Sequence, residues 1–273
     1  MEKVNRSILI LTLVLASMAA AIPIAYGQLI IFQDNFDADP VQTYTSPNNL
    51  PGWTYGGGGP PTVFDLGGGN HSAGVANNAE SSSIKQYVGV SGQSQLDIYF
   101  DVRFMYIRPQ RDTFTSAGIS LRPLPYGPER QIQLQLFGDS SVRLFLDGSY
   151  ATPLASFTYT GGDIFQAGDW QSMRMSVDIL AGSVTAYDLT KSGNTPLFTY
   201  TDASLFNNGS GNNVQLLYLQ GDYAASKNAL SQFDNIVVYD SVVPEPSLIS
   251  LLVVGFGLLG FSALRKRRSL LGR

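Results

Sequence analysis

Apolar and polar residues alternate along much of this chain, a pattern typical of β-strands that bury one face and leave the other in water. The longest alternating run begins at residue 96, and one of its faces carries the charged residues Asp97, Asp101 and Arg103. The opposite face is apolar and consists of Leu96, Ile98, Phe100, Val102, Phe104 and Tyr106. The pattern therefore predicts a long strand with one side in the core.

Two hairpins are predicted from shorter alternating runs that flank turn residues. In the first, residues 132–136 and 142–146 flank Gly138 and Asp139. In the second, residues 173–179 and 184–186 flank Ala181 and Gly182, and Trp170 at its start is expected in the core. Further strands are expected at residues 214–218 and 233–239.

Strands at this spacing, separated by clusters of Gly, Asn, Asp and Pro, predict an all-β fold for residues 28–240, which we call the passenger domain. No stretch of the passenger has sustained helical periodicity with capping residues. We expect an antiparallel two-sheet β-sandwich of the jelly-roll type. The glycine runs at 56–59 and 67–69 predict long exposed loops between short strands in residues 33–78.

The first 27 residues have the organisation of a signal peptide. Lys3 and Arg6 precede an apolar segment at residues 8–21, and Ala25 and Gly27 supply the small residues that a signal peptidase reads. We expect cleavage after Gly27. The alternative is an uncleaved anchor, and Pro23 argues against it because proline breaks the helix just before the small residues.

Residues 241–273 contain three features in succession. Pro244, Glu245 and Pro246 come first, and residues 247–264 then form an uncharged run of 18 residues, close to the roughly 20 that span a bilayer. A basic cluster follows directly, made of Arg265, Lys266, Arg267 and Arg268. Because basic residues set the orientation of a transmembrane helix, we expect this end in the cytoplasm and the passenger on the outer side of the membrane.

These three features together resemble a PEP-CTERM sorting signal. The resemblance covers only the last 30 or so residues. It implies that a membrane transpeptidase-like enzyme, exosortase, recognises and cuts the region of Pro244, Glu245 and Pro246 in a bacterium that secretes exopolysaccharide. The alternative is an ordinary C-terminal anchor in which Pro-Glu-Pro is only an extended linker, since proline fixes φ and removes backbone donors.

Charge and cysteine content exclude several classes of function. Seven of the 17 Lys and Arg residues and two of the 21 acids lie in the two ends, so the passenger carries 10 basic and 19 acidic residues, a net charge of −9. We expect no nucleic-acid partner, because phosphate binding needs clustered basic residues. The chain has no cysteine, which rules out disulfides and thiolate chemistry.

Four short motifs of the passenger resemble concanavalin A-like and laminin G-like jelly rolls. They are Asp34-Asn35-Phe36-Asp37, Gly168-Asp169-Trp170, Gly182-Ser183-Val184 and Phe233-Asp234-Asn235-Ile236. In many of those folds the first and last strands lie side by side. That arrangement would bring Asp34, Asp37 and Asp234 together as oxygen ligands for Ca²⁺. The alternative is that these residues end strands and accept hydrogen bonds from local backbone amides.

Sugar binding is the commonest role of those folds, and we expect Tyr44, Trp53 and Tyr55 in the loop-rich segment to be the exposed aromatic residues that stack on a sugar. Enzyme classes find little support. The Glu-x-Asp-x-x-Glu pattern of laminarinase-like hydrolases is absent, and Glu80 and Glu129 are the only glutamates in the passenger. The single histidine, His71, is expected to be a solvated loop residue.

The sequence therefore leaves three hypotheses. The first is an exported, non-enzymatic surface or matrix protein, sorted by exosortase through the membrane and associated with exopolysaccharide. The second is a lectin-like carbohydrate-binding module that contacts a specific glycan. The third is a glycoside hydrolase or lyase with an unfamiliar site.

Overall fold

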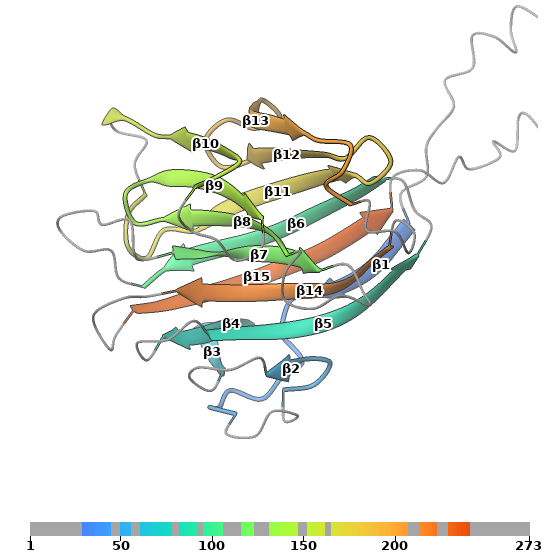
Figure 1. Ribbon diagram of the computed structural model, residues 1–273. Coiled ribbons are helices and arrows are strands. Elements are labelled where there is room, and N and C mark those ends of the chain that lie inside the picture. The colour runs from blue at the N-terminus through green and yellow to red at the C-terminus, as the bar shows by residue number, and fades with distance from the viewer. Residues whose placement is uncertain are drawn as a thin grey trace, which may run out of the picture. The chain divides into compact units, whose positions relative to one another are not determined.

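Alternation along the strands produces two antiparallel sheets, stacked face to face in the computed structural model (Figure 1). The structure describes residues 29–44, 50–55, 61–77, 82–91, 95–105, 116–122, 131–146, 152–161, 165–206, 213–222 and 229–240. The predicted signal peptide (1–27) and sorting signal (241–273) lie outside these ranges. No helix within the described ranges has the length and apolar character needed to cross a membrane.

The larger sheet has eight described strands. In order across the sheet they are β13 (Pro196–Thr201), β12 (Ser183–Asp188), β11 (Gln171–Asp178), β6 (Gln95–Phe104), β15 (Ala229–Asp240), β4 (Asn70–Asn77) and β3 (Thr62–Gly67), with β1 (Leu29–Asp34) also paired to β15. The seven described strands of the other sheet are β10 (Ala155–Thr158), β9 (Ser141–Leu146), β8 (Ile132–Phe137), β7 (Ser116–Arg122), β14 (Asn213–Asp222), β5 (Ser82–Ser91) and β2 (Thr54–Tyr55). The prediction of an all-β, antiparallel two-sheet sandwich is confirmed.

The core lies between the sheets and is built from the inner positions of their strands. Ile98 and Met175 of the larger sheet belong to the same buried cluster as Ile119 and Leu134 of the smaller one. Along β6, buried residues alternate with partly exposed ones, as the sequence predicts for residues 96–104. Burial of such aliphatic side chains is worth about 1.5–3 kcal/mol each, so the shared cluster is the main source of stability.

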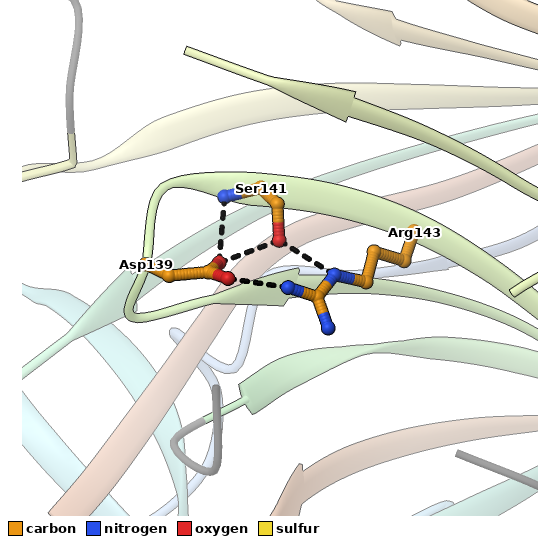
Figure 2. Close-up of polar contacts among 3 residues, drawn as sticks. All are labelled: Asp139, Ser141 and Arg143. Atoms are coloured by element: carbon orange, nitrogen blue, oxygen red, sulfur yellow. Dashed lines mark hydrogen bonds and ion pairs between the residues drawn. The ribbon is translucent and has the colours of Figure 1, made fainter. Parts of the chain in front are cut away.

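Both predicted hairpins are present, as β8–β9 and β11–β12. Figure 2 shows the turn of the first, where Ser141 and Arg143 of β9 converge on Asp139. Asp139 Oδ1 accepts hydrogen bonds from the backbone N–H of Ser141 at 3.0 Å and from its hydroxyl at 2.5 Å, and Oδ2 pairs with Arg143. These contacts hold Ser140 at φ 64°, a left-handed conformation that L-residues avoid.

Strand β8 differs from expectation. Its residues alternate apolar and Gln, which predicts one wet face, but every residue from Ile132 to Phe137 is buried. Gln133 and Gln135 therefore lie in the interior. Alternation in one strand cannot show whether another segment covers its polar face, and this is the reason for the difference.

The first and last strands of the passenger lie side by side, as expected. Strand β1 pairs antiparallel with β15, with Leu29 opposite Asp240 and Asp34 opposite Ile236. On the other edge β15 pairs with β6, and a bulge between Asp234 and Val237 interrupts that ladder.

The segment 33–78 contains more regular structure than the prediction of long loops implies. Strands β3 and β4 form a hairpin there, and Gly67, Gly68 and Gly69 lie at its turn, all with positive φ. The second glycine run, at 56–59, lies outside the described residues.

Candidate functional site

The candidate site is the outer face of the larger sheet, where alternation points polar side chains away from the core. Antiparallel pairing aligns Arg174 of β11 directly with Tyr187 of β12 on one side and with Tyr99 of β6 on the other. The three residues thus form a row across three neighbouring strands. Since adjacent strands lie about 4.8 Å apart, the row extends for about 10 Å.

A second row runs parallel to the first, two residues along each strand. It comprises Thr185 of β12, Ser176 of β11, Asp97 of β6 and Tyr239 of β15, each opposite the next. The β11 and β12 members of both rows, with Asp97 of β6, line a groove of about 400 Å³, which is in the size range of small-ligand sites, and Tyr99 and Tyr239 continue the rows beside it. The groove residues are Gln95, Leu96, Asp97, Arg174, Ser176, Val177, Asp178, Ser183, Thr185 and Tyr187.

Arg174 is held between aromatic rings. Its Cζ lies 3.7 Å from the centre of the Tyr187 ring and 5.9 Å from that of Tyr99, and Nη1 donates a long hydrogen bond of 3.5 Å to the Tyr99 hydroxyl. Burial acts to lower the pKa of the guanidinium, but the hydrogen bond and charge of Tyr99 and the charges of Tyr187 and Asp97 outweigh it, so the pKa is raised. The groove therefore contains a permanent, well-positioned cation.

The carboxylates of the groove are held by neighbours on the same face. Ser176 donates its hydroxyl hydrogen to Asp97 Oδ1. Asp178 accepts hydrogen bonds from Gln95 Nε2 at 3.2 Å and from the backbone N–H of Ala181 at 2.8 Å. Tyr99 and Tyr239 meet edge to face at 5.5 Å. The groove thus presents ring faces, hydroxyls, carboxylates and a guanidinium, which are the groups that bind sugars.

None of the groove residues was a predicted site residue. The alternation predicts that Asp97 lies on the polar face of its strand, but it gives no indication of a site at Tyr99, Arg174 or Tyr187. The available signal is that large aromatic and charged side chains occupy the outward positions of these strands. Their convergence depends on the register between strands, which the alternation within each strand does not specify.

The predicted calcium ligands lie in a different place, at the β1–β15 corner. The charges of Asp101, Asp37 and Asp34 all raise the pKa of Asp234, so the three predicted ligands share this region of the fold, although they form no metal-binding group of three within the described residues. Burial is the largest cause of the pKa of Asp234 being raised to about 6, and the hydrogen bond from the Asn235 amide partly opposes it.

The corner does not fit a calcium ion. Asp34 accepts hydrogen bonds from the Phe36 amide at 2.8 Å and from Trp53 Nε1 at 2.6 Å, so both carboxylate oxygens are engaged. Asp37 accepts one from the His71 amide at 2.8 Å on Oδ1 and one from Asn35 Nδ2 on Oδ2. Within the described ranges no group of three or more His, Asp or Glu side chains is placed to hold a metal. Asp34 therefore fits the alternative better, in which it ends a strand and accepts a hydrogen bond from a nearby backbone amide.

Two of the three predicted sugar-stacking aromatics are buried, which corrects the expectation. Tyr44 and Trp53 are each only 3% exposed. Trp53 packs against Phe32 and Phe36, with ring centres 5.5 and 5.8 Å away, and its N–H bonds to Asp34. Rings covered on all sides cannot stack on a sugar. Tyr55 belongs to β2, and its side chain lies outside the described part of the structure.

The predictions for Trp170 and His71 also need correction. Trp170 is partly exposed rather than in the core, and Arg103 lies over its ring at 4.6 Å. His71 is a residue of β4 rather than of a solvated loop, and its Nδ1 is buried, with no hydrogen-bond partner among the described residues. Glu80 and Glu129 lie outside the described ranges.

No protein-family model and no curated protein matches the sequence. The structure is similar to that of a mutant carbohydrate recognition domain of Emp46p, with a TM-score of 0.52, 16% identity, and coverage of 80% of this chain and 100% of that chain. It is also similar to the binding domain of botulinum neurotoxin serotype G, with a TM-score of 0.51 and 16% identity over 82% of this chain and 50% of that chain.

A third similar structure is the binding domain of Paraclostridial Mosquitocidal Protein 1, with a TM-score of 0.51, 13% identity, and coverage of 83% of this chain and 52% of that chain. The chain thus spans about half of each toxin domain. At these identities the likeness shows the fold alone. In fold, the passenger is an antiparallel two-sheet β-sandwich that is similar to these domains.

Proposed function

We propose that the passenger is a non-catalytic, concanavalin A-like jelly roll that binds a carbohydrate polymer in the groove on its larger sheet. The observation that carries the proposal is the row of Tyr187, Arg174 and Tyr99, which presents two aromatic rings and a cation on one exposed face. The likeness in fold to the carbohydrate recognition domain of Emp46p agrees with this function.

The chemistry of the groove suits a sugar chain better than a compact apolar ligand. Pyranose rings present C–H groups on their faces and hydroxyls around their edges, so they need flat apolar surfaces beside polar partners. Tyr187 and Tyr99 supply rings in one row, while Asp97 and Thr185 supply oxygens in the next row along the strands. A sheet face with both kinds of group can contact successive sugars of a polymer.

Tyr187→Ala should weaken binding of isolated exopolysaccharide by about tenfold or more. A nucleic-acid base stacked on an aromatic side chain contributes about 1–3 kcal/mol, and we expect a similar contribution from a sugar stacked on this ring. Binding is measured by affinity electrophoresis of the purified protein with the polymer in the gel. Phe157→Ala is the control, because Phe157 is an aromatic residue 36% exposed on β10 of the other sheet.

Equal retardation of the two variants and the wild type would show that the groove is not the site. A sugar product released from the polymer by the wild-type protein would contradict the non-catalytic part of the proposal. Thermal melting of each variant checks that the sandwich remains folded.

We also propose that the chain is exported after signal-peptidase cleavage, held in the inner membrane by residues 247–264 with the passenger on the periplasmic side, and passed by exosortase to the cell surface or extracellular matrix. The proposal is supported by the order of Pro244, Glu245 and Pro246, the uncharged run and the basic cluster 265–268. It is compatible with a passenger that binds exopolysaccharide.

Replacing Pro244, Glu245 and Pro246 together by Ala should block removal of the tail, while the apolar run and basic cluster keep the protein in the membrane. The C-terminal mass of envelope protein measures the cut. The matched control replaces Ser247 and Ser250 by Ala, which leaves the motif intact. An ordinary anchor would keep its tail in all three proteins, and that result would contradict sorting.

A further inference from the structure

The guanidinium of Arg174 has hydrogen-bonding capacity that the described residues do not use. Arg carries five N–H donors. Within the described residues, Nη1 donates a hydrogen bond of 3.5 Å to the Tyr99 hydroxyl, which is at the limit of hydrogen-bond length. Nε is buried and has no hydrogen-bond partner among the described residues. A cation stacked on Tyr187 at 3.7 Å is nevertheless fixed in place, so its two Nη groups are preorganised donors.

The charge of Asp97 acts on this cation from the next position along the strand, but neither carboxylate of the groove pairs with it directly. Asp97 accepts a hydrogen bond from Ser176, and Asp178 accepts bonds from Gln95 and the Ala181 amide. Within the described residues, no ion pair joins either carboxylate to Arg174. They remain negative groups on the next positions along the strands, about 7 Å from the Arg174 row for a two-residue step.

This arrangement favours a ligand with one carboxylate at Arg174 and disfavours a ligand with a second carboxylate on the neighbouring sugar. A planar guanidinium matches a carboxylate through two parallel N–H···O bonds. A carboxylate on the neighbouring sugar, however, would approach Asp97 or Asp178 and be repelled. Binding sites often gain specificity from such a repulsive element as well as from an attractive one.

We propose that the groove selects an acidic heteropolysaccharide in which a uronate is flanked by neutral sugars, with the uronate carboxylate bound by Arg174. This inference rests on the proposed function, because it names the polymer class for the same groove. The tyrosine rings contact the sugar faces, and Asp97 and Asp178 accept hydrogen bonds from hydroxyls of the flanking neutral sugars.

The test compares four polymers in affinity electrophoresis with the full chain. Gellan has one uronate per repeat among neutral sugars, carboxyl-reduced gellan has the same backbone without the charge, polygalacturonate has a uronate at every residue, and dextran is neutral. The wild type is expected to bind gellan about tenfold or more tightly than either carboxyl-reduced gellan or polygalacturonate. The preference should shrink as NaCl is raised, because it is ionic.

Arg174→Gln should bind gellan and carboxyl-reduced gellan equally, at the level of the wild type with the reduced polymer. Arg174→Lys keeps the positive charge but lacks the paired N–H donors of the guanidinium, so it should retain only part of the wild-type preference for gellan over carboxyl-reduced gellan. Asp178→Asn should strengthen binding of polygalacturonate at least threefold. Thermal melting shows whether each variant is folded, and the polymer comparison on the wild type needs no variant.

Equal wild-type binding of gellan and its reduced form would overturn the acidic-polymer inference while leaving glycan binding intact. Tighter binding of polygalacturonate than of gellan would overturn the requirement for flanking neutral sugars. Failure to bind all four polymers and the isolated exopolysaccharide would overturn the proposed function, and this inference with it.

Discussion

At the residue scale, the corner where β1 meets β15 shows how burial changes a single carboxyl group. Asp234 lies opposite Asp101 of β6. Burial first, and then the charges of Asp101, Asp37 and Asp34, raise its pKa to about 6. Asp39 in the same corner has its pKa raised by burial and then by the charge of Asp34. The folded state therefore favours protonated forms here.

The raised pKa predicts that Asp234 destabilises the fold as it ionises. An unfolded Asp has a pKa of about 3.9, so the stabilising contribution of protonated Asp234 is complete below about pH 4 and is lost as pH rises through about 6. Asp234→Asn should be more stable than the wild type at pH 7 by about 1 kcal/mol, allowing for solvent screening of a half-buried group, and equal to it near pH 4.

Urea unfolding of both proteins at pH 4, 5.5 and 7 measures this difference. Asp169→Asn is the matched control, because it makes the same substitution at an exposed position outside the corner. Asp39 is present in both proteins, so its effect on the free energy of unfolding cancels when the two proteins are compared. A stability difference between the Asp234 variant and the wild type that is constant from pH 4 to 7 would show that ionisation of Asp234 is not its cause.

Single residues were the hardest feature to predict from the sequence. Trp53 lies in a glycine-rich segment without periodicity, so nothing local indicates that Phe32, Phe36 and Asp34 surround it. Those partners come from a distant strand and the turn after it. The pairing of the terminal strands β1 and β15, by contrast, could be anticipated from the motif resemblance.

At the element scale, alternation within a strand was sufficient to predict β6 and both hairpins. It was not sufficient to predict the groove. A row such as Tyr187, Arg174 and Tyr99 exists only in one register of three strands, and a shift of two residues would break the row while leaving every side chain on the same face. The turn that joins β11 to β12 helps to set that register.

Gly182 in this turn should not tolerate a side chain. It has φ +65°, and a Cβ there would lie 2.0 Å from the backbone oxygen of Asp202. Gly182→Ala should therefore destabilise the protein by about 3 kcal/mol or more, of which about 1–2 kcal/mol is the left-handed backbone and the rest the clash.

Gly193, between β12 and β13, provides the matched comparison. It has φ +58° but open space around the position of a Cβ, so Gly193→Ala should cost only the backbone term of about 1–2 kcal/mol. Denaturant midpoints of the two variants measure the difference. Equal losses in the two proteins would mean that the Asp202 carbonyl moves aside without cost.

At the scale of the whole molecule, strand spacing and turn residues predicted the two-sheet sandwich, since few other folds bury so many one-sided strands. The sequence did not reveal that β8 is buried on both faces. A covered outer face depends on tertiary contacts that no local pattern encodes.

The pairing of β15 with β6 also determines how the sandwich bears mechanical load. Strand β15 ends at Asp240, where the chain continues toward the tail, and Tyr239 lies opposite the groove residue Asp97 of β6. Tension between a polymer held in the groove and an anchored tail would thus pass through two neighbouring central strands.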